Sequence, residues 1–386
     1  MLNFDFYNPT HIVFGRDRLA ELDKLVPENA TVLVTFDSEY AKMFDTVDKV
    51  KAALKNRRVI EFGNIQANPK YESLIEAVEI AKTNQVDLLL AVGGGSVMDA
   101  TKFIAMAATH TEREYSALLS HGFTPFSIDE ALPLGCVVTL PATGSEMNMA
   151  GVVTLNGQKM AFMCPQVFPA FSFLDPELTL TLPKSQVANG VVDAYIHVIE
   201  QYLTYPVNAM VQDRIAEGIM KTLIEVGPVT YNDNSNVEAR MNFIWSATNA
   251  QNGIIGVGVP HDWSTHIIGH ELTSLFGIAH GRTLAIILPS LLRERKEQKR
   301  EKLLQYAERV WGIETGTDDE KIDLVIDKTE HFFRSFDINT KLSEYDIDEN
   351  GIEQIVGNLD RLGMTALSER GDLTLDIVKK ILKAAM

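Results

Sequence analysis

The chain has 386 residues, of which 46% are hydrophobic and 23% charged, a balance typical of globular proteins and a length sufficient for two domains. Its formal net charge of −17 disfavours nucleic acid and anionic membranes as partners. The N-terminus lacks the pattern of a signal peptide, no apolar run approaches a membrane span, and only two cysteines occur, so a cytoplasmic protein is expected.

The first half of the chain alternates apolar strands with helices. An amphipathic helix is expected at 71–82, and strands are expected at 9–15, 31–36, 58–62, 87–92, 134–140 and 171–175. This alternation predicts an α/β fold, in which a parallel sheet is covered by helices on both faces. Asp37 directly follows the second strand, at the carboxyl end where such sheets bind ligands.

A glycine-rich turn, Gly93-Gly94-Gly95-Ser96, separates the strand 87–92 from a helix beginning VMDATKF. Glycines let the backbone approach a ligand, and the free N–H groups of a helix N-terminus attract phosphate. The spacing is not G-x-G-x-x-G, and a plain flexible turn is the alternative interpretation. Asp99, on the first turns of the helix, is expected to cap it, bind ligand or face solvent.

A second ligand-binding segment is expected after the strand 134–140. There the sequence PATGSEMN brings small residues and the hydroxyls of Thr143 and Ser145 to the carboxyl end of the sheet. Lys159, further along the chain, is a candidate phosphate contact, although a single lysine is usually solvated.

The composition changes at Pro183, after which no convincing strand follows. We expect residues 1–182 to form a dinucleotide-binding α/β domain and residues 183–386 an all-helical metal-binding domain, with a ligand cleft between them. The charge run RERKEQKREK, residues 293–302, is interpreted as an exposed helix face. Helical patterns cover 186–203, 208–226, 236–253, 260–276, 281–312, 318–335, 347–361 and 373–385.

Two candidate metal ligands lie in the first of these helices. Asp193 and His197 are four residues apart in VANGVVDAYIHVIE and therefore share one helix face. A carboxylate buried in such an apolar helix requires a charge partner. An ordinary helix acid and a packed histidine are the alternative interpretation.

Four of the nine histidines fall within the segment 261–283, HDWSTHIIGHELTSLFGIAHGRT. His266 and His270 share one face of an apolar helix. Glycines flank His280, which predicts that the helix ends or bends there and lets His280 fold back toward His266. Separate core histidines bonded to backbone carbonyls are the alternative, but several imidazoles on one apolar helix favour a metal.

The predicted ligand set contains one carboxylate and three imidazoles, a combination that suits Fe²⁺ or Zn²⁺. Its members are Asp193, His197, His266 and His280. His270 would stand beside the metal, where it could contact substrate or relay a proton. Glu271 follows the second histidine of the helix, so the H-E-x-x-H pattern of zinc peptidases is absent.

Together these segments resemble the iron-containing (group III) alcohol dehydrogenase family over essentially the whole chain. The resemblance rests on Asp193-x-x-x-His197, His266-x-x-x-His270-Glu271, His280-Gly281, GGGSVMDATK and TLPATGSEMN. The segments LLAVGGGSVMDATKFIA, VANGVVDAYIHVIEQY and KLLQYAERVWGI are similar to the NAD(P)H-dependent butanol dehydrogenase and broad-range aldehyde reductase branch. The resemblance implies a Rossmann-like domain followed by a helical domain, as in dehydroquinate synthase. It also implies hydride transfer between NAD(P)H and small or medium-chain aldehydes or alcohols, such as butanal and butanol.

The same resemblance implies roles for individual residues. The four ligands named above would bind the metal, and His270 would flank the nicotinamide and the substrate. Cofactor contacts are implied for Gly94, Gly95, Ser96 and Asp99 at the pyrophosphate, Thr139, Leu140, Thr143 and Asn148 at the nicotinamide, Asn68 and Lys159 at the ribose or adenosine, and the segment from Leu178 to Leu182 along the cofactor cleft. Family members are commonly homodimers or larger homo-oligomers, so self-association is expected.

One departure from the family pattern concerns cofactor choice. Members that prefer NADP have small glycines after the second strand, whereas this chain has Phe36-Asp37-Ser38-Glu39. An acid at a strand end hydrogen-bonds the ribose 2′-hydroxyl and repels a 2′-phosphate. Asp37 and Glu39 therefore favour NAD, with a helix cap as the alternative role for Asp37.

Two other functions are considered. A metal- and NAD-dependent lyase of the dehydroquinate synthase type would need several basic residues around a phosphorylated substrate. The expected pocket residues are apolar instead, namely Met149, Phe162, Ile254, Ile255 and Trp263. A non-catalytic nucleotide-binding protein with a structural metal would require a closed shell of four ligands.

Overall fold

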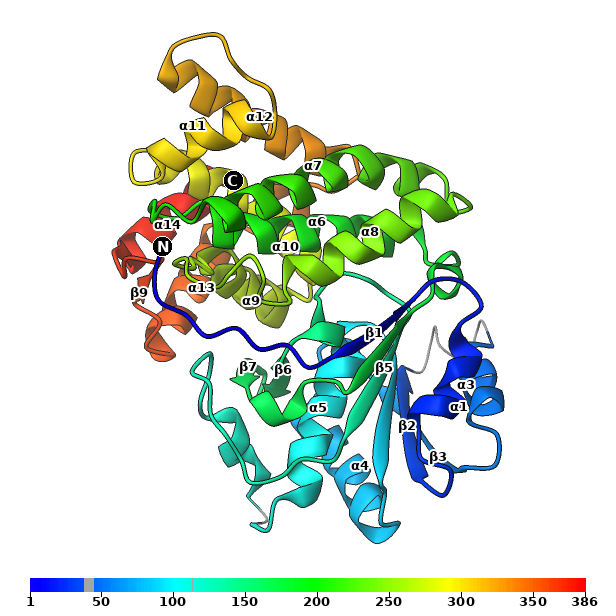
Figure 1. The fold of residues 1–386 in the computed structure, drawn as a ribbon. Helices are drawn as coiled ribbons and strands as arrows, with labels where there is room; N and C mark the ends of the chain where they lie inside the picture. Colours follow the sequence, from blue (N-terminus) through cyan, green and yellow to red (C-terminus); the bar gives the residue numbers. More distant parts are fainter. Residues whose placement is uncertain (38–44, 113) are drawn as a thin grey trace. The chain divides into compact units, whose positions relative to one another are not determined.

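The computed structural model describes residues 1–37, 45–112 and 114–386. The chain forms two compact units (Figure 1), Tyr7–Leu182 and Pro183–Met386 together with Met1–Phe6. The first six residues thus join the helical unit, whereas the sequence assigned them to the α/β domain. The backbone N–H of Leu2 donates to the carbonyl of Gly258 at 2.9 Å, which attaches this segment to the helical unit.

The α/β unit is built on a six-stranded sheet with the order β1-β8-β5-β4-β2-β3. Each neighbouring pair is parallel, which confirms the predicted sheet. The central strands are buried along nearly their whole length, which is why they read as continuous apolar runs. The strands are β1 His11–Phe14, β2 Thr31–Asp37, β3 Arg58–Ile65, β4 Leu88–Gly93, β5 Leu134–Val138 and β8 Phe171–Leu174. The helices are α1 Leu22–Leu25, α3 Thr46–Leu54, α4 Tyr71–Thr83 and α5 Gly95–Thr109.

A separate antiparallel hairpin, β6 Ala150–Leu155 with β7 Gln158–Met163, belongs to the same unit. Asn156 and Gly157 form its turn with φ angles of 51° and 77°. Positive φ at both central residues is the geometry that matches the twist of a two-residue hairpin, and Asn-Gly favours it. The strands expected from the sequence include neither β6 nor β7, although the Asn-Gly pair was an available signal.

The second unit is helical, as predicted. Its helices are α6 Lys184–Tyr202, α7 Met210–Asn232, α8 Val237–Ala250, α9 Ser264–Phe276, α10 His280–Glu294, α11 Arg300–Arg309, α12 Asp318–Arg334, α13 Glu349–Arg361 and α14 Leu375–Ala384. It is not purely helical, because β9 Ala366–Leu367 and β10 Leu373–Thr374 pair antiparallel. Strands of two residues are too short to produce a detectable alternation of apolar and polar residues.

The interpretation of residues 293–302 as one exposed helix face was only partly right. The expected helix 281–312 is interrupted between α10 and α11, and three of its basic residues, Arg295, Lys299 and Lys302, are buried. Each is paired with an acid, at 2.6 Å to Asp372, 2.7 Å to Asp262 and 2.6 Å to Asp213 respectively. Burial of a charge is tolerated when a partner of opposite charge is in contact, and no local pattern shows such a partner.

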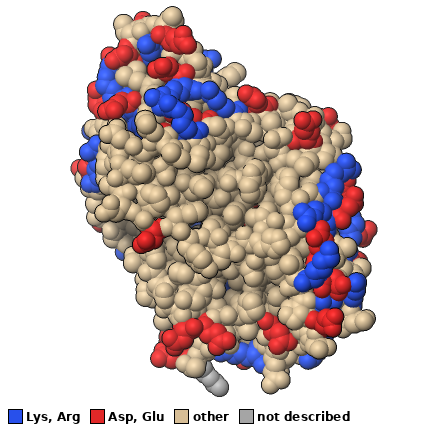
Figure 2. All heavy atoms as spheres, in the orientation of Figure 1, with Lys and Arg blue, Asp and Glu red and all other residues tan. Residues whose placement is uncertain are grey.

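The described helices include none that is both long and apolar enough to cross a membrane. Figure 2 shows that acidic and basic side chains gather along the borders of one face and are sparse over its middle. Several large apolar side chains near the N-terminus are exposed, including Met1, Leu2, Phe4, Phe6 and Tyr7.

Candidate metal centre

The helix α6 supplies the first part of the centre. It has 19 residues, and those from Val191 to Tyr202 are all buried, as expected for a helix that is apolar on every side. Asp193, His197 and Glu200 are polar residues at positions i, i+4 and i+7 of this helix, so they project from one face. A row of polar side chains inside an apolar helix therefore faces a single site.

A turn between two helices brings the remaining histidines to the same place. His266 lies on α9, which ends at Gly277, whose left-handed φ of 69° closes the helix. The next helix, α10, starts at His280, so the chain reverses within three residues. A Cβ atom on Gly281 would lie 2.5 Å from the carbonyl oxygen of Asn189. Glycine at this position thus allows α10 to begin directly against α6.

The four residues proposed from the sequence as metal ligands converge around one carboxylate. The Oδ1 atom of Asp193 lies 3.7 Å from a ring nitrogen of each histidine, His197, His266 and His280. The ligand atoms of Asp193, His266 and His280 all lie within 4.8 Å of one another. The ring of His197 stacks on that of His266, with centroids 4.6 Å apart. The side chain of His280 is 24% exposed, so the cluster is open on one side.

The donor atoms of this cluster fit a divalent cation. Within the described part of the chain, the buried nitrogens His197 Nδ1 and His266 Nε2 have no hydrogen-bond partner. Buried polar atoms without a partner are costly, and a cation would use their lone pairs. His266 Nδ1 donates to the carboxylate of Glu200. The lone pair of the same ring is then on Nε2, the nitrogen that faces Asp193. One oxygen and three nitrogens are a donor set that Fe²⁺ and Zn²⁺ accept.

The same contacts shift the pKa values of two imidazoles in opposite directions. Burial lowers the pKa of His197 to about 4, despite the nearby Asp193 carboxylate, so this ring is neutral at pH 7. Burial also lowers the pKa of His266, but the carboxylates of Glu200 and Asp193 outweigh it and raise the pKa to about 9. The carboxylates that orient the His266 ring therefore also favour a proton on Nε2, which a cation bound there would replace.

His270 lies beside the cluster. It is one turn further along α9 than His266, and its ring centroid lies 5.1 Å from that of His280 and 6.4 Å from that of His266. The carboxylate of Glu271 is buried elsewhere and accepts a hydrogen bond from Asn358 on α13 at 2.7 Å. The helix thus directs His270 toward the cluster and Glu271 away from it.

Of the expected apolar pocket residues, Trp263 lies beside the cluster. Its ring centroid is 5.3 Å from that of His266 and 6.1 Å from that of His197. Phe162 and Ile255 are buried, with exposed fractions of 0% and 2%. Their proposed place in a substrate pocket stays a prediction.

The sequence analysis missed three polar residues behind the cluster, Glu200, Asp262 and Lys299. Glu200 binds His266 directly, and Asp262 forms an ion pair with Lys299 at 2.7 Å. The available signal for Glu200 was its spacing of seven residues from Asp193, two helical turns along the same face. Lys299 gave no signal, because it lies within a run of charges that is typical of solvated helices.

In the α/β unit, the glycine-rich turn contacts the segment that follows β5. Gly94 precedes α5, and the N–H of Thr139 donates to the carbonyl of Gly93 at 3.0 Å. A Cβ atom on Gly95 would lie 2.6 Å from Thr143, and one on Gly94 would lie 3.0 Å from Leu140. The N–H of Asn68 donates to the Ser96 hydroxyl at 3.3 Å. The structure therefore brings seven proposed cofactor residues together, namely Asn68, Gly94, Gly95, Ser96, Thr139, Leu140 and Thr143.

Two further cofactor candidates make contacts inside the protein. Asp99 accepts hydrogen bonds from the Ser145 hydroxyl at 2.7 Å and from the Val152 N–H at 2.9 Å, and burial raises its pKa. It thus binds the loop and the hairpin and does not cap α5. The Asn148 side chain accepts from Lys102 at 3.0 Å, and burial lowers the pKa of Lys102 to about 8.

The other cofactor candidates lie on separate elements. Asp37 is the last residue of β2, the strand next to β4, and Lys159 lies on β7 opposite Thr154. Leu178 packs against the core of the sheet, and Leu182 is buried at the end of the unit. Glu39, the second acid proposed to disfavour NADP, lies outside the described residues.

Comparison with known proteins places this fold and site in a family. The model of the iron-containing alcohol dehydrogenases matches residues 9–176, and the model of the C-terminal region of the Fe-containing alcohol dehydrogenase family matches residues 187–386. The chain belongs to the iron-containing alcohol dehydrogenase family. It is an oxidoreductase with alcohol dehydrogenase or aldehyde reductase function, as the resemblance implied.

Similar proteins fall in the expected branch. The chain is 49% identical to the NADPH-dependent aldehyde reductase YqhD of Escherichia coli over the full length of both proteins. It is 32% identical to the NADH-dependent butanol dehydrogenase A of Clostridium acetobutylicum over 92% of each. A crystal structure of Escherichia coli YqhD superposes with a TM-score of 0.97 at 48% identity, covering 100% of this chain and 99% of that one. NADH-dependent butanol dehydrogenase A from Thermotoga maritima gives 0.93 at 31% identity, with the same coverage.

Proposed function

We propose that this protein reduces small and medium-chain aldehydes such as butanal, and oxidises the corresponding alcohols, with NAD(H) and one divalent cation. The observation that carries the proposal is the convergence of three imidazole nitrogens at 3.7 Å from one Asp193 oxygen. The printed names of the similar proteins, an aldehyde reductase and butanol dehydrogenases, support the substrate class. Trp263 beside the histidines supports an apolar substrate.

We propose these roles for the residues of the helical unit. Asp193, His197, His266 and His280 hold Fe²⁺ or Zn²⁺, and His270 exchanges a proton with the substrate oxygen or with water through its ring nitrogen. When bound, the cation supplies a Lewis acid that polarises the substrate oxygen, and the nicotinamide supplies or accepts the hydride. The exposed side of His280 supports an open, catalytic site and opposes a closed structural one.

We propose that the α/β unit binds the dinucleotide at the turn of Gly94, Gly95 and Ser96. The backbone N–H groups at the start of α5 would bind the pyrophosphate, because a helix N-terminus favours negative charge. Contact between this turn and Thr139, Leu140 and Thr143 supports a nicotinamide-binding role for the loop after β5. Asp37 supports a preference for NAD, although the similar proteins include both NADPH- and NADH-dependent enzymes.

We further propose that two copies of the chain form a homodimer in the cytoplasm. Among the described strands, β1 forms one edge of the sheet, and large apolar side chains are exposed next to it in sequence. The free thiols of Cys136 and Cys164 support a reducing compartment.

The proposed function is tested by butanal reduction with purified protein, comparing NADH and NADPH. Removal of the metal by a chelator is expected to abolish NADH oxidation, and reloading with Fe²⁺ or Zn²⁺ is expected to restore it. His266→Ala should lose bound metal and activity together, because it removes the ring that faces Asp193. Absence of turnover with either metal would overturn the proposal. Full activity and retained metal in His266→Ala would exclude this residue as a ligand.

A further inference from the structure

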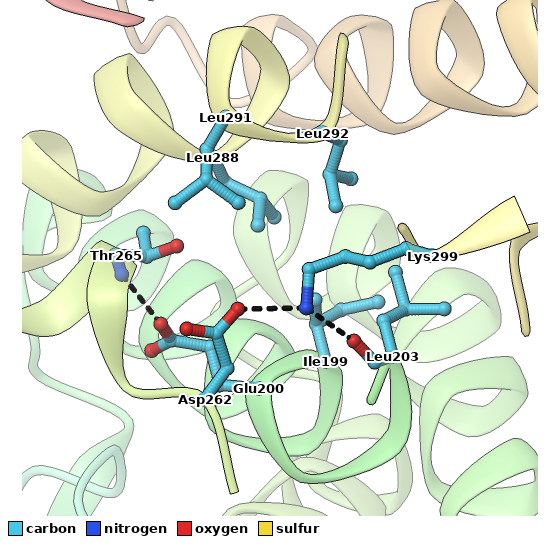
Figure 3. Close-up of a pocket in the computed structure, with 9 residues that line it drawn as sticks. All are labelled: Ile199, Glu200, Leu203, Asp262, Thr265, Leu288, Leu291, Leu292 and Lys299. Carbon is cyan, nitrogen blue, oxygen red and sulfur yellow. Dashed lines mark hydrogen bonds and ion pairs between the residues drawn. The ribbon is translucent and has the colours of Figure 1, made fainter. Parts of the chain in front are cut away.

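A buried row of charged side chains lies behind His266, outside the candidate ligand set. Glu200, Asp262 and Lys299 are all buried, with exposed fractions of 3%, 7% and 4%. Figure 3 shows them together around a small space that is closed on its other side by leucines of α10. This space is too small to hold a water molecule. The charged groups must therefore be satisfied by one another and by nearby backbone.

Glu200 connects the helix α6 to the first turn of α9. Its Oε1 atom accepts a hydrogen bond from the Thr265 N–H at 2.6 Å, and its Oε2 atom accepts one from His266 Nδ1. Its backbone carbonyl accepts from the Asp262 N–H at 2.9 Å. One residue thus fixes both the ring of a proposed metal ligand and the backbone on either side of the helix start. Such carboxylate–histidine contacts set the tautomer and orientation of a ligand.

Asp262 connects the same helix start to Lys299. Its Oδ1 atom accepts hydrogen bonds from the N–H and the hydroxyl of Ser264, and its Oδ2 atom lies 2.7 Å from Lys299 Nζ. Lys299 also donates to the carbonyl of Leu203 at the end of α6, at 2.6 Å, and lies 3.3 Å from Glu369. Lys299 itself lies in the turn between α10 and α11. From there it contacts the end of α6, the start of α9 and the segment after β9.

The helix start that this network holds is strained. Trp263, between Asp262 and Ser264, has a φ of 61°, in the left-handed region that bulky residues avoid. A residue persists in such a conformation only when its surroundings enforce it, and strain of this kind costs on the order of 1–3 kcal/mol. The contacts of Asp262 with Ser264 and Lys299 enforce it here. His266 lies only one turn beyond this point, so the position of its ring depends on the same contacts.

We propose that Lys299 is a positioning residue for His266 that acts through Asp262, while Glu200 holds the ring itself. The inference rests on the proposed metal centre. Lys299 forms ion pairs with both Asp262 and Glu369, and a buried carboxylate that loses its partner moves toward water. Such a movement would release the Ser264 N–H, relax Trp263 and shift the His266 ring away from Asp193.

The experiment measures metal binding directly, independently of turnover. The full-length protein is stripped with a chelator and titrated with Co²⁺, whose visible absorption reports the geometry of its ligands, and with Zn²⁺ against a competing chelator. Lys299→Met is expected to weaken Zn²⁺ binding about 10-fold and to change the Co²⁺ spectrum, and Glu200→Gln should do the same more strongly, up to about 100-fold. Lys302→Met is the matched control, because it removes another buried lysine that is paired with Asp213 and not with Asp262.

The outcomes separate this inference from the proposed function. If the unsubstituted protein binds neither Co²⁺ nor Zn²⁺, the metal centre itself is refuted. If it binds metal and Lys299→Met leaves affinity and spectrum unchanged, or tightens binding without a spectral change, Lys299 does not position His266. If Lys299→Met does not fold, Asp262→Asn tests the same connection with nearly the same side-chain volume. An unaltered Co²⁺ spectrum in that variant would also overturn the inference.

Discussion

At the scale of single residues, the proposed preference for NAD depends on Asp37. It ends β2, and β2 pairs in parallel with β4, the strand that leads into the glycine-rich turn. The carboxyl ends of both strands therefore meet at the edge of the sheet where dinucleotides bind. A carboxylate there accepts a hydrogen bond from a ribose 2′-hydroxyl but repels a 2′-phosphate.

Asp37→Gly is expected to raise kcat/KM for NADPH relative to NADH by at least about 10-fold, equivalent to about 1.4 kcal/mol. The physical reason is the loss of both the repulsion of the 2′-phosphate and the hydrogen bond to the 2′-hydroxyl. The measurement is butanal reduction with each cofactor. Asp48→Gly is the control, because it removes the same charge from an exposed carboxylate that lies on α3 and not on β2. An unchanged ratio in Asp37→Gly would remove this residue from cofactor selection.

Sequence reasoning at this scale succeeded where spacing within one helix was informative. Asp193 and His197, or His266 and His270, could be paired because residues four apart share a helix face. Glu200 and Lys299 illustrate the limit, since their partners lie 65 and 37 positions away in the chain, at Thr265 and Asp262 (265 − 200 and 299 − 262). Contacts between elements follow from tertiary packing, which a single sequence does not display.

At the scale of elements, the turn between α9 and α10 determines where His280 lies. The three atoms nearest to a Cβ on Gly281 all belong to the backbone of Asn189, one helical turn before Asp193 on α6. Backbone cannot move aside as a flexible side chain can. The close approach of α10 to α6 at this glycine therefore sets the 3.7 Å separation between His280 and Asp193.

Gly281→Ala is expected to displace the start of α10 from α6, weaken Zn²⁺ binding at least about 10-fold and cost about 1–3 kcal/mol of stability. Gly277→Ala is the matched control, because a Cβ there meets no atom within 4 Å although its φ is positive. It should cost about 1–2 kcal/mol from backbone strain while keeping the metal affinity. Chelator competition and thermal unfolding measure the two effects separately. Equal metal affinity in both variants would refute this role of Gly281.

The elements that the sequence predicted well are those with long periodic patterns. The buried strands of the sheet and helices such as α6 and α12 agree with expectation within a few residues. The break between α10 and α11 was missed because the charges of residues 293–302 continue a helical pattern through it. The chain turns there because Arg295 and Lys299 are buried. Their burial depends on ion pairs with Asp372 and Asp262, respectively.

At the scale of the whole molecule, the change from alternating strands and helices to helices alone was visible in the sequence at Pro183. The attachment of Met1–Phe6 to the helical unit was not visible. It involves the backbone hydrogen bond between Leu2 and Gly258 and the close approach of the Phe4 side chain to that glycine, and a single sequence does not display contacts of this range. The same limit applies to self-association, because an exposed apolar residue and a core residue are alike in sequence.

The last prediction concerns the proposed homodimer. The sheet ends at β1, an edge strand of four residues, and an open edge favours pairing with another chain. Tyr7, four residues before β1, is 74% exposed, an unusual position for an aromatic side chain in a monomer. In a dimer with twofold symmetry, a single substitution changes the residue in both copies at the interface. Light scattering should therefore give twice the chain mass of 42.9 kDa for the unsubstituted protein.

Tyr7→Asp is expected to shift this equilibrium toward monomer by at least about 10-fold in the dissociation constant, because it removes aromatic contact area and places like charges on both copies. Leu324→Asp is the control, since Leu324 on α12 is 43% exposed but lies far along the chain from β1. It should leave the mass unchanged. A monomeric unsubstituted protein would refute the dimer, and a dimer equally stable in both variants would place its interface away from Tyr7 and β1.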